Sequence, residues 1–140
     1  MGAPPQPAPK STGPEQPDEL ARAMVLAVAA GRVAIGAGAF FATRKALALL
    51  GFEQPSGAAV ALARLAGGRD IALGLHALRA GSDPERLREA ATIGAFVDGG
   101  DAIAFAAALV SRDGIDRTAA MNVPIAGSAV VAGIWALRRL

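Results

Sequence analysis

Four long apolar segments follow one another along this chain, and they constrain its fold more than any other feature. They cover about residues 23–43, 57–78, 90–110 and 118–137. Each is about 20 residues long, the length that an α-helix needs to cross a hydrocarbon layer of roughly 30 Å. Their apolar residues do not alternate with polar ones, which argues against strands. The sequence therefore predicts an all-α protein, a bundle of four transmembrane helices.

The composition agrees with a membrane bundle. Hydrophobic residues make up 53% of the chain and charged residues 19%, against roughly 45–50% and 25% in soluble domains. Glycines recur in two of the segments, and small residues allow membrane helices to pack closely. They are Gly31, Gly36 and Gly38 in the first segment, and Gly67, Gly74 and Gly81 at seven-residue spacing in the second.

A soluble, alanine-rich four-helix bundle is the alternative. The ionisable groups inside the segments and a mean hydropathy of only +0.39 favour it. Against it, the segment 118–137 has no charged residue and offers only Thr118, Asn122 and Ser128 as polar side chains. A soluble helix normally has a polar face, so the membrane interpretation is preferred.

Residues 1–18 differ from the rest of the chain. They are rich in proline and cannot bury enough apolar surface to offset the entropy of ordering, so we expect a disordered tail. The tail has no apolar run followed by a cleavage site, as a signal peptide would. Residues 19–140 then form the membrane domain. Within it, Ser56 and the run Ser82–Glu85, which includes Pro84, are typical helix starts.

The distribution of basic residues predicts an orientation. One side of the membrane would carry seven Lys and Arg and the other four, which places both termini in the cytoplasm. The larger group is Lys10, Arg22, Arg79, Arg86, Arg88, Arg138 and Arg139, and the smaller is Arg44, Lys45, Arg112 and Arg117. The bias towards Arg and Ala is typical of a GC-rich bacterial genome, so the expected location is a bacterial inner membrane, crossed several times.

Six charged residues lie inside the apolar segments: Arg32, Arg64, Arg69, Asp70, Asp98 and Asp101. Each unpaired charge costs roughly 2.5–3.5 kcal/mol at mid-membrane, so the three positive and three negative groups are expected to pair. Asp98 and Asp101, three residues apart, share one helix face. Arg69 and His76 share a face of the second segment. We therefore predict a buried polar cluster of Arg32, Arg69, Asp70, Asp98 and Asp101, with His76 nearby.

Several classes of protein are excluded or disfavoured by composition. The chain has no cysteine and one histidine, which rules out disulfides, thiol catalysis and a multi-His metal site within one chain, and disfavours haem. A formal charge of +2, without a basic stripe, gives no indication of nucleic-acid binding. No metal and no cofactor are expected. The expected partners are the lipid bilayer and, because four helices make a thin bundle, a second copy of the chain.

The same positions resemble a family of small bacterial four-helix integral membrane proteins that is catalogued as a domain of unknown function. The matching features are Arg32 with Gly36, the run Gly68-Arg69-Asp70 followed by Leu73-Gly74, and the pair Asp98 and Asp101. The resemblance covers about residues 25–137. It implies four helices and these polar positions, and it supplies no activity.

Three functions remain open on the sequence alone. The cluster would bind or pass a proton or a small anionic solute, with Arg32 and Arg69 as anion contacts and Asp98 and Asp101 as proton acceptors. Alternatively, Asp98 and Asp101 would act as general acid and base on a lipid or isoprenoid-like substrate. In the third interpretation the ion pairs only fix the helix arrangement of a structural or accessory subunit. No catalytic signature decides whether the protein is an enzyme.

Overall fold

The computed structural model describes residues 18–52, 54–112, 114 and 116–140, which form five α-helices and no strand. The prediction of an all-α protein is confirmed, and each apolar segment corresponds to one long helix. The expected disordered tail lies, except for Asp18, outside the described residues. The helices are α1 (Glu19–Phe41), α2 (Thr43–Leu49), α3 (Gly57–Ala80), α4 (Pro84–Ser111) and α5 (Asp116–Leu137).

Local sequence signals explain where two of the long helices begin. The Ser56 side chain accepts a hydrogen bond from the backbone N–H of Ala59 and caps α3. Asp83 caps α4 by accepting from the backbone N–H groups of Glu85 and Arg86, and Pro84 occupies the first helical position. Both starts were expected from the sequence, because these side chains satisfy backbone donors that have no partner within the helix. The short helix α2 was not predicted.

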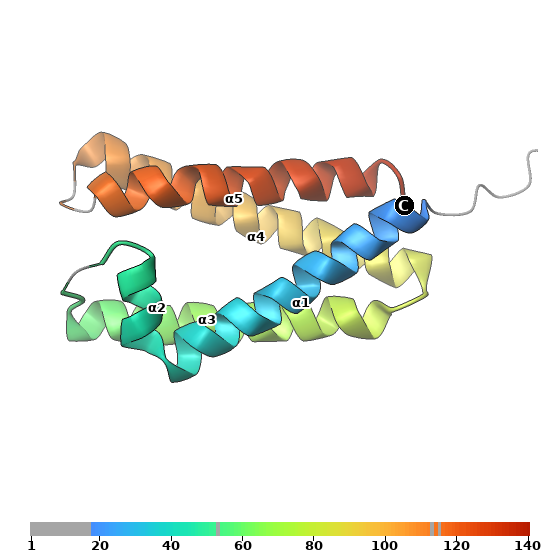
Figure 1. The fold of residues 1–140 in the computed structure, drawn as a ribbon. Coiled ribbons are helices and arrows are strands. Elements are labelled where there is room, and N and C mark those ends of the chain that lie inside the picture. The colour runs from blue at the N-terminus through green and yellow to red at the C-terminus, as the bar shows by residue number, and fades with distance from the viewer. Residues whose placement is uncertain (1–17, 53, 113, 115) are drawn as a thin grey trace, which may run out of the picture.

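The long helices form two antiparallel pairs, α1 with α3 and α4 with α5 (Figure 1). At the end of the bundle where Asp18 and Leu140 lie, the pairs meet through a small apolar cluster: Ala21, Val25, Ala80, Leu87, Ala91 and Ala136. At the opposite end, the turn after α2 contacts α5, where the amide of Asn122 lies 3.5 Å from the carbonyl oxygen of Leu50. The two pairs are therefore joined at both ends of the bundle, and the middle of the bundle lies between these two contacts.

Glycines set the distance between α1 and α3. A Cβ atom at Gly67 would lie 2.6 Å from the carbonyl oxygen of Gly36, and one at Gly36 would lie 2.7 Å from the carbonyl oxygen of Gly67. A Cβ atom at Gly74 would lie 2.6 Å from the carbonyl oxygen of Ala29. The two backbones thus touch at these glycines, as membrane helices with small residues do.

Not every glycine in the predicted stripes serves this packing. Gly31 and Gly38 have no atom of another residue within 4 Å of a Cβ built on them. Gly81 lies beyond the helix as the C-cap of α3, with a φ of 54°. Glycine tolerates such a positive φ without steric cost.

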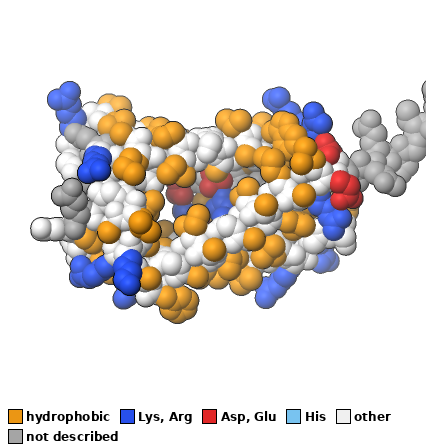
Figure 2. Space-filling model, viewed as in Figure 1, with side chains coloured by type: hydrophobic (Ala, Val, Ile, Leu, Met, Phe, Trp, Pro, Cys, Tyr) orange, Lys and Arg blue, Asp and Glu red, His pale blue; other side chains and the backbone are white. Residues whose placement is uncertain are grey.

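Large apolar side chains lie on the outside of the molecule. Leu87 is the largest side chain that is fully buried, and the rest of the core is mainly alanine. Ile35, Leu65, Phe96, Ile103 and Val131 are all more than 60% exposed. Figure 2 shows hydrophobic side chains over much of the visible face and Lys and Arg side chains gathered at its two ends. A belt of this kind suits contact with lipid and would be unfavourable in water.

Three of the described helices are long and apolar enough to cross a membrane: α1, α4 and residues Arg117–Leu137 of α5. The prediction that all four apolar segments are long and apolar enough to cross a membrane is therefore corrected, because α3 is not apolar enough. Its 24 residues include Arg64, Arg69, Asp70 and Arg79, and the charges outweigh its aliphatic residues. The outward face of α3 is nevertheless apolar, since Leu62, Leu65, Leu75 and Leu78 are exposed.

A hydrogen bond and an ion pair join the two ends of the described chain. The backbone N–H of Asp18 donates to the carbonyl oxygen of Arg139 at 3.2 Å, and the two side chains form an ion pair at 3.1 Å. The pKa of Asp18 is lowered, first by the hydrogen bond from the Leu20 N–H and then by Arg139. The contact is therefore fully formed above the pKa of the unfolded chain and is lost only as the pH falls through the lower, folded value.

We expect Gly67→Ala to destabilise the protein by roughly 1–3 kcal/mol, the usual cost of overpacking a tight contact. The added methyl group would meet backbone atoms of Gly36 and Phe40 at 2.6 and 2.9 Å, and backbone cannot move aside as a flexible side chain can. Unfolding in mixed detergent micelles, followed by the fluorescence of the single tryptophan, Trp135, would measure the loss.

Gly38→Ala is the matched control, because it makes the same change on α1 where a Cβ atom meets open space. It should leave stability unchanged or raise it by up to about 1 kcal/mol through helix propensity. Equal losses for the two variants would show that α1 and α3 are not in backbone contact.

Candidate functional site: a buried arginine–aspartate network

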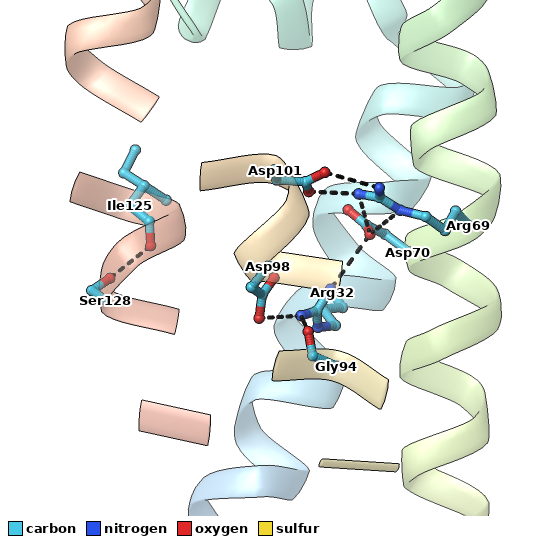
Figure 3. A network of polar contacts seen from close by, with 8 residues as sticks. All are labelled: Arg32, Arg69, Asp70, Gly94, Asp98, Asp101, Ile125 and Ser128. Atoms are coloured by element: carbon cyan, nitrogen blue, oxygen red, sulfur yellow. Dashed lines mark hydrogen bonds and ion pairs between the residues drawn. The ribbon is translucent and has the colours of Figure 1, made fainter. Parts of the chain in front are cut away.

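Arg32, near the middle of α1, contacts two other helices (Figure 3). Its Nη2 donates to Oδ2 of Asp98 on α4 at 2.5 Å and to the carbonyl oxygen of Gly94 at 3.3 Å. Its Nη1 lies 3.5 Å from Oδ1 of Asp70 on α3. Arg32 therefore links α1 to both α3 and α4 through charge-assisted contacts, the strongest class of hydrogen bond.

A second arginine extends the network on α3. Nη1 and Nη2 of Arg69 donate to the two carboxylate oxygens of Asp101 at 3.0 and 2.7 Å. Nε and Nη2 of the same residue lie 3.4 and 3.3 Å from Oδ1 of Asp70. Asp70 thus sits between the two guanidiniums, and the side chains form one chain in the order Asp98, Arg32, Asp70, Arg69, Asp101 (Figure 3).

The helix packing explains why these side chains meet. The close contact of Gly36 with Gly67 fixes the register of α1 against α3, and a Cβ atom at Gly36 would lie 3.1 Å from the Cβ of Asp70. Asp98 and Asp101 are three residues apart on α4, so both point from one face towards this pair. The close approach of α1 and α3 brings the short Asp70 side chain within 3.5 Å of Arg32. The long arginine side chains span the distance to the two carboxylates on α4.

Burial differs along the network. The side chains of Arg32 and Asp98 are 14% and 13% exposed, whereas those of Arg69 and Asp101 are 38% and 37% exposed. Figure 2 shows acidic and basic side chains in a hollow between the helix pairs, near the middle of the visible face. One end of the network is therefore enclosed by the bundle, and the other is partly open to its surroundings.

The charges of the network do not balance. Three carboxylates face two guanidiniums, so the formal charge is −1 when all five groups are ionised. The equal balance expected from the sequence fails because Arg64 lies elsewhere. Arg64 is exposed, and its Nε donates to Oγ1 of Thr43 at 3.3 Å. Arg64 is five residues from Arg69, which places it about 140° around the helix, and that spacing could have revealed its different face.

The structure brings together five of the six predicted site residues. His76 is exposed on α3, and it makes no hydrogen bond or ion pair with the described part of the chain. It shares the helical face of Arg69 by angle but lies about two turns further along the helix. One participant was not predicted: the carbonyl oxygen of Gly94, which accepts from Arg32. Gly94 precedes Asp98 by four residues, so it occupies the same helix face.

A cavity of about 50 Å³ adjoins the enclosed end of the network. Residues of α1, α3, α4 and α5 line it, and the only charged residues among them are Arg32 and Asp98. The other lining residues are Ala, Gly, Val, Leu and Met. A water molecule needs roughly 10–15 Å³ on this scale and two to four polar partners. The cavity therefore has room for water beside the Arg32–Asp98 pair.

These contacts limit the chemistry of the site. Both guanidiniums already hold carboxylates, so neither offers a free positive charge to an anion. Among the described residues no group of His, Asp or Glu is placed to hold a metal ion. What the network has in excess is one carboxylate, and a carboxylate can accept a proton.

The comparisons with known proteins give no relative. No family model, no curated protein and no solved structure matches the chain. The resemblance to a family of small four-helix membrane proteins therefore remains an expectation.

The charge imbalance predicts that arginine and aspartate substitutions differ in cost. Arg32→Met should lower stability by about 3–5 kcal/mol, the loss seen when one partner of a buried ion pair is removed. It would leave three carboxylates with one guanidinium. Asp70→Asn should cost about 1 kcal/mol or less, since two matched ion pairs remain. Helical content by circular dichroism during unfolding in mixed micelles would measure both.

Arg64→Met serves as the control, because Arg64 is an exposed arginine outside the network. It should cost less than Arg32→Met. If Asp70→Asn proved as damaging as Arg32→Met, the network would not carry an excess negative charge.

Proposed function

We propose that this is a small multi-pass membrane protein whose buried Arg/Asp network takes up and releases a proton. The observation that carries the proposal is the ratio of three carboxylates to two guanidiniums near the middle of the helices. An excess negative charge in apolar surroundings is costly, and one proton removes it. A proton fits this site better than an anionic solute, because both arginines are already paired.

In this proposal α3 crosses the bilayer together with the three more apolar helices. Its charged residues Arg69 and Asp70 point into the network, while its outward leucines would face lipid. Asp18 and Arg139, near the two ends of the described part of the chain, lie together at one end of the bundle, and the excess of Lys and Arg there favours the cytoplasmic side. The inner membrane of a bacterium is the proposed location, and a second copy of the chain is a proposed partner.

Substituted cysteines would test whether α3 spans the bilayer, because the chain has no cysteine of its own. Leu65→Cys, on the exposed face of α3, should resist a membrane-impermeant maleimide in proteoliposomes and react after detergent is added. Ser82→Cys, in the connection between α3 and α4, should react with the same reagent in open or inside-out vesicles. Rapid labelling of Leu65→Cys in intact proteoliposomes would exclude the fourth span.

Proton counting tests the function itself. The starting chain is His76→Gln, which removes the single histidine, because histidine is the residue type that ordinarily exchanges protons near neutral pH. In this background, Asp70→Asn, Asp98→Asn and Asp101→Asn should each lower proton uptake near neutral pH, by up to about one proton per chain, because each removes the excess carboxylate and any proton still bound is taken up only at lower pH. Uptake would be recorded with a pH-indicator dye in weakly buffered micelles.

Arg64→Gln in the same background is the control, because it removes an arginine outside the network. It should leave the number of protons taken up per chain unaltered. If the three Asn variants took up as many protons as the starting chain, the network would have no proton to exchange, and a purely structural role would follow. A proteoliposome assay with an imposed pH gradient would then separate a protein that binds a proton from one that passes it.

A membrane-embedded enzyme is the second candidate, and one observation favours it. The Arg69–Asp101 pair is more than a third exposed near the middle of the bundle, where a lipid or isoprenoid-like molecule would reach it from the side. Asp98 and Asp101 would then serve as acid and base. A lipid that copurifies with the wild type and is lost in Asp101→Asn would support this function over proton exchange alone.

A further inference from the structure

The three carboxylates of the network are held in three different ways. Asp101 receives hydrogen bonds on both oxygens from Arg69. Asp70 is contacted on Oδ1 by two guanidiniums, at 3.3 to 3.5 Å. Asp98 has a single guanidinium, on Oδ2 at 2.5 Å, and its Oδ1 receives no hydrogen bond from the described part of the chain. Asp98 is therefore the carboxylate with the fewest donors.

Asp98 is also the most enclosed carboxylate, and it is the one that lines the cavity between the four long helices. The negative charges near Asp98 raise the free energy of its ionised form. Arg32 faces it from α1, Asp70 from α3 and Asp101 from its own helix. The residues that α5 contributes to the cavity are Ala129, Ala132, Gly133 and Ala136, none of which is charged. One cation and two further anions thus act on an enclosed anion that water can approach.

We infer that Asp98 is the carboxyl that exchanges the proton and that Arg32 changes its partner when this happens. The inference rests on the proposed function and assigns the role of each residue in it. A proton adds to the Asp98 carboxylate and gives the neutral acid, so the network charge goes from −1 to zero. Arg32 keeps its charge and turns to Asp70, whose Oδ1 is already 3.5 Å away. The Arg69–Asp101 pair remains as it is.

This change has a structural consequence, because the two partners of Arg32 lie on different helix pairs. The contact with Asp98 ties α1 to α4 and so joins the two pairs, whereas the contact with Asp70 lies within the α1–α3 pair. Uptake of a proton therefore weakens the connection between the pairs in the middle of the bundle. Arg32 acts as a positioning residue for Asp98 and couples its protonation to the packing of the helices.

Site-resolved NMR tests the assignment. The carboxyl carbon shifts of Asp70, Asp98 and Asp101 would be followed against pH in the full chain in micelles, with signals assigned by the single Asn variants. We expect Asp98 alone to titrate over the range in which the dye reports proton uptake, while Asp70 and Asp101 stay ionised. In Asp98→Asn, the other two signals should be independent of pH over that range.

The partner change of Arg32 requires a second measurement. In Asp70→Asn no alternative carboxylate remains for Arg32 at that position of α3, so Asp98 should bind its proton at least tenfold more weakly, a shift of the midpoint by about one pH unit to lower pH. Arg64→Gln, outside the network, should leave the midpoint of Asp98 where it is in the wild type. An unmoved midpoint in Asp70→Asn would overturn the partner change.

The outcomes distinguish this inference from the proposed function. Proton uptake with titration of Asp70 or Asp101 instead of Asp98 would overturn the inference and leave proton binding by the network intact. No uptake by the dye and no titrating carboxyl would overturn both. Uptake together with a titrating Asp98 supports both, and the Asp70→Asn midpoint then decides the role of Arg32.

Discussion

Arg32 is the side chain on which the relative placement of three helices depends. A guanidinium in apolar surroundings has to be matched by negative partners or it destabilises the fold. Those partners come from α3 and α4, so the position of α1 is fixed relative to both. The apolar contacts between the two helix pairs are mainly small alanine-rich clusters and the turn after α2, so the ion pairs are the main polar link in the middle.

Small residues make this electrostatic arrangement feasible. An aspartate side chain is short, so Asp70 on α3 lies within reach of Arg32 on α1 only when the two helix backbones are close. Gly36, Gly67 and Gly74 allow that approach between α1 and α3, and Ala95 packs against Gly133 between α4 and α5. The large side chains are consequently displaced to the outer surface, where a bilayer would solvate them. The apolar exterior and the polar centre are thus two results of the same close packing.

Much of this arrangement follows from the sequence, and the rest fails for identifiable reasons. Helix length and capping signals such as Ser56 place the long helices, and the spacing of Asp98 and Asp101 places both on one face. Spacing gives the face of a helix but not its neighbour, so His76 was grouped with Arg69 although the network ends before reaching it. Arg64 enters the expected balance of three positive and three negative groups by count alone, although its five-residue spacing from Arg69 places it on another face of α3. The short helix α2 was missed because Arg44 and Lys45 mark the end of the first apolar segment and no side chain caps the seven residues of α2.

The position of α3 in the network bears on how the chain enters the membrane. Arg69 and its bidentate partner Asp101 are 32 residues apart in sequence, so the guanidinium of α3 is synthesised well before the carboxylate that neutralises it. Arg32 on α1, made earlier, meets only Asp70. The least apolar of the long helices therefore has an unmatched positive charge until α4 is complete. In the proposed arrangement, in which α3 crosses the bilayer, efficient insertion requires α3 and α4 to enter the membrane together, as a hairpin, rather than one helix at a time.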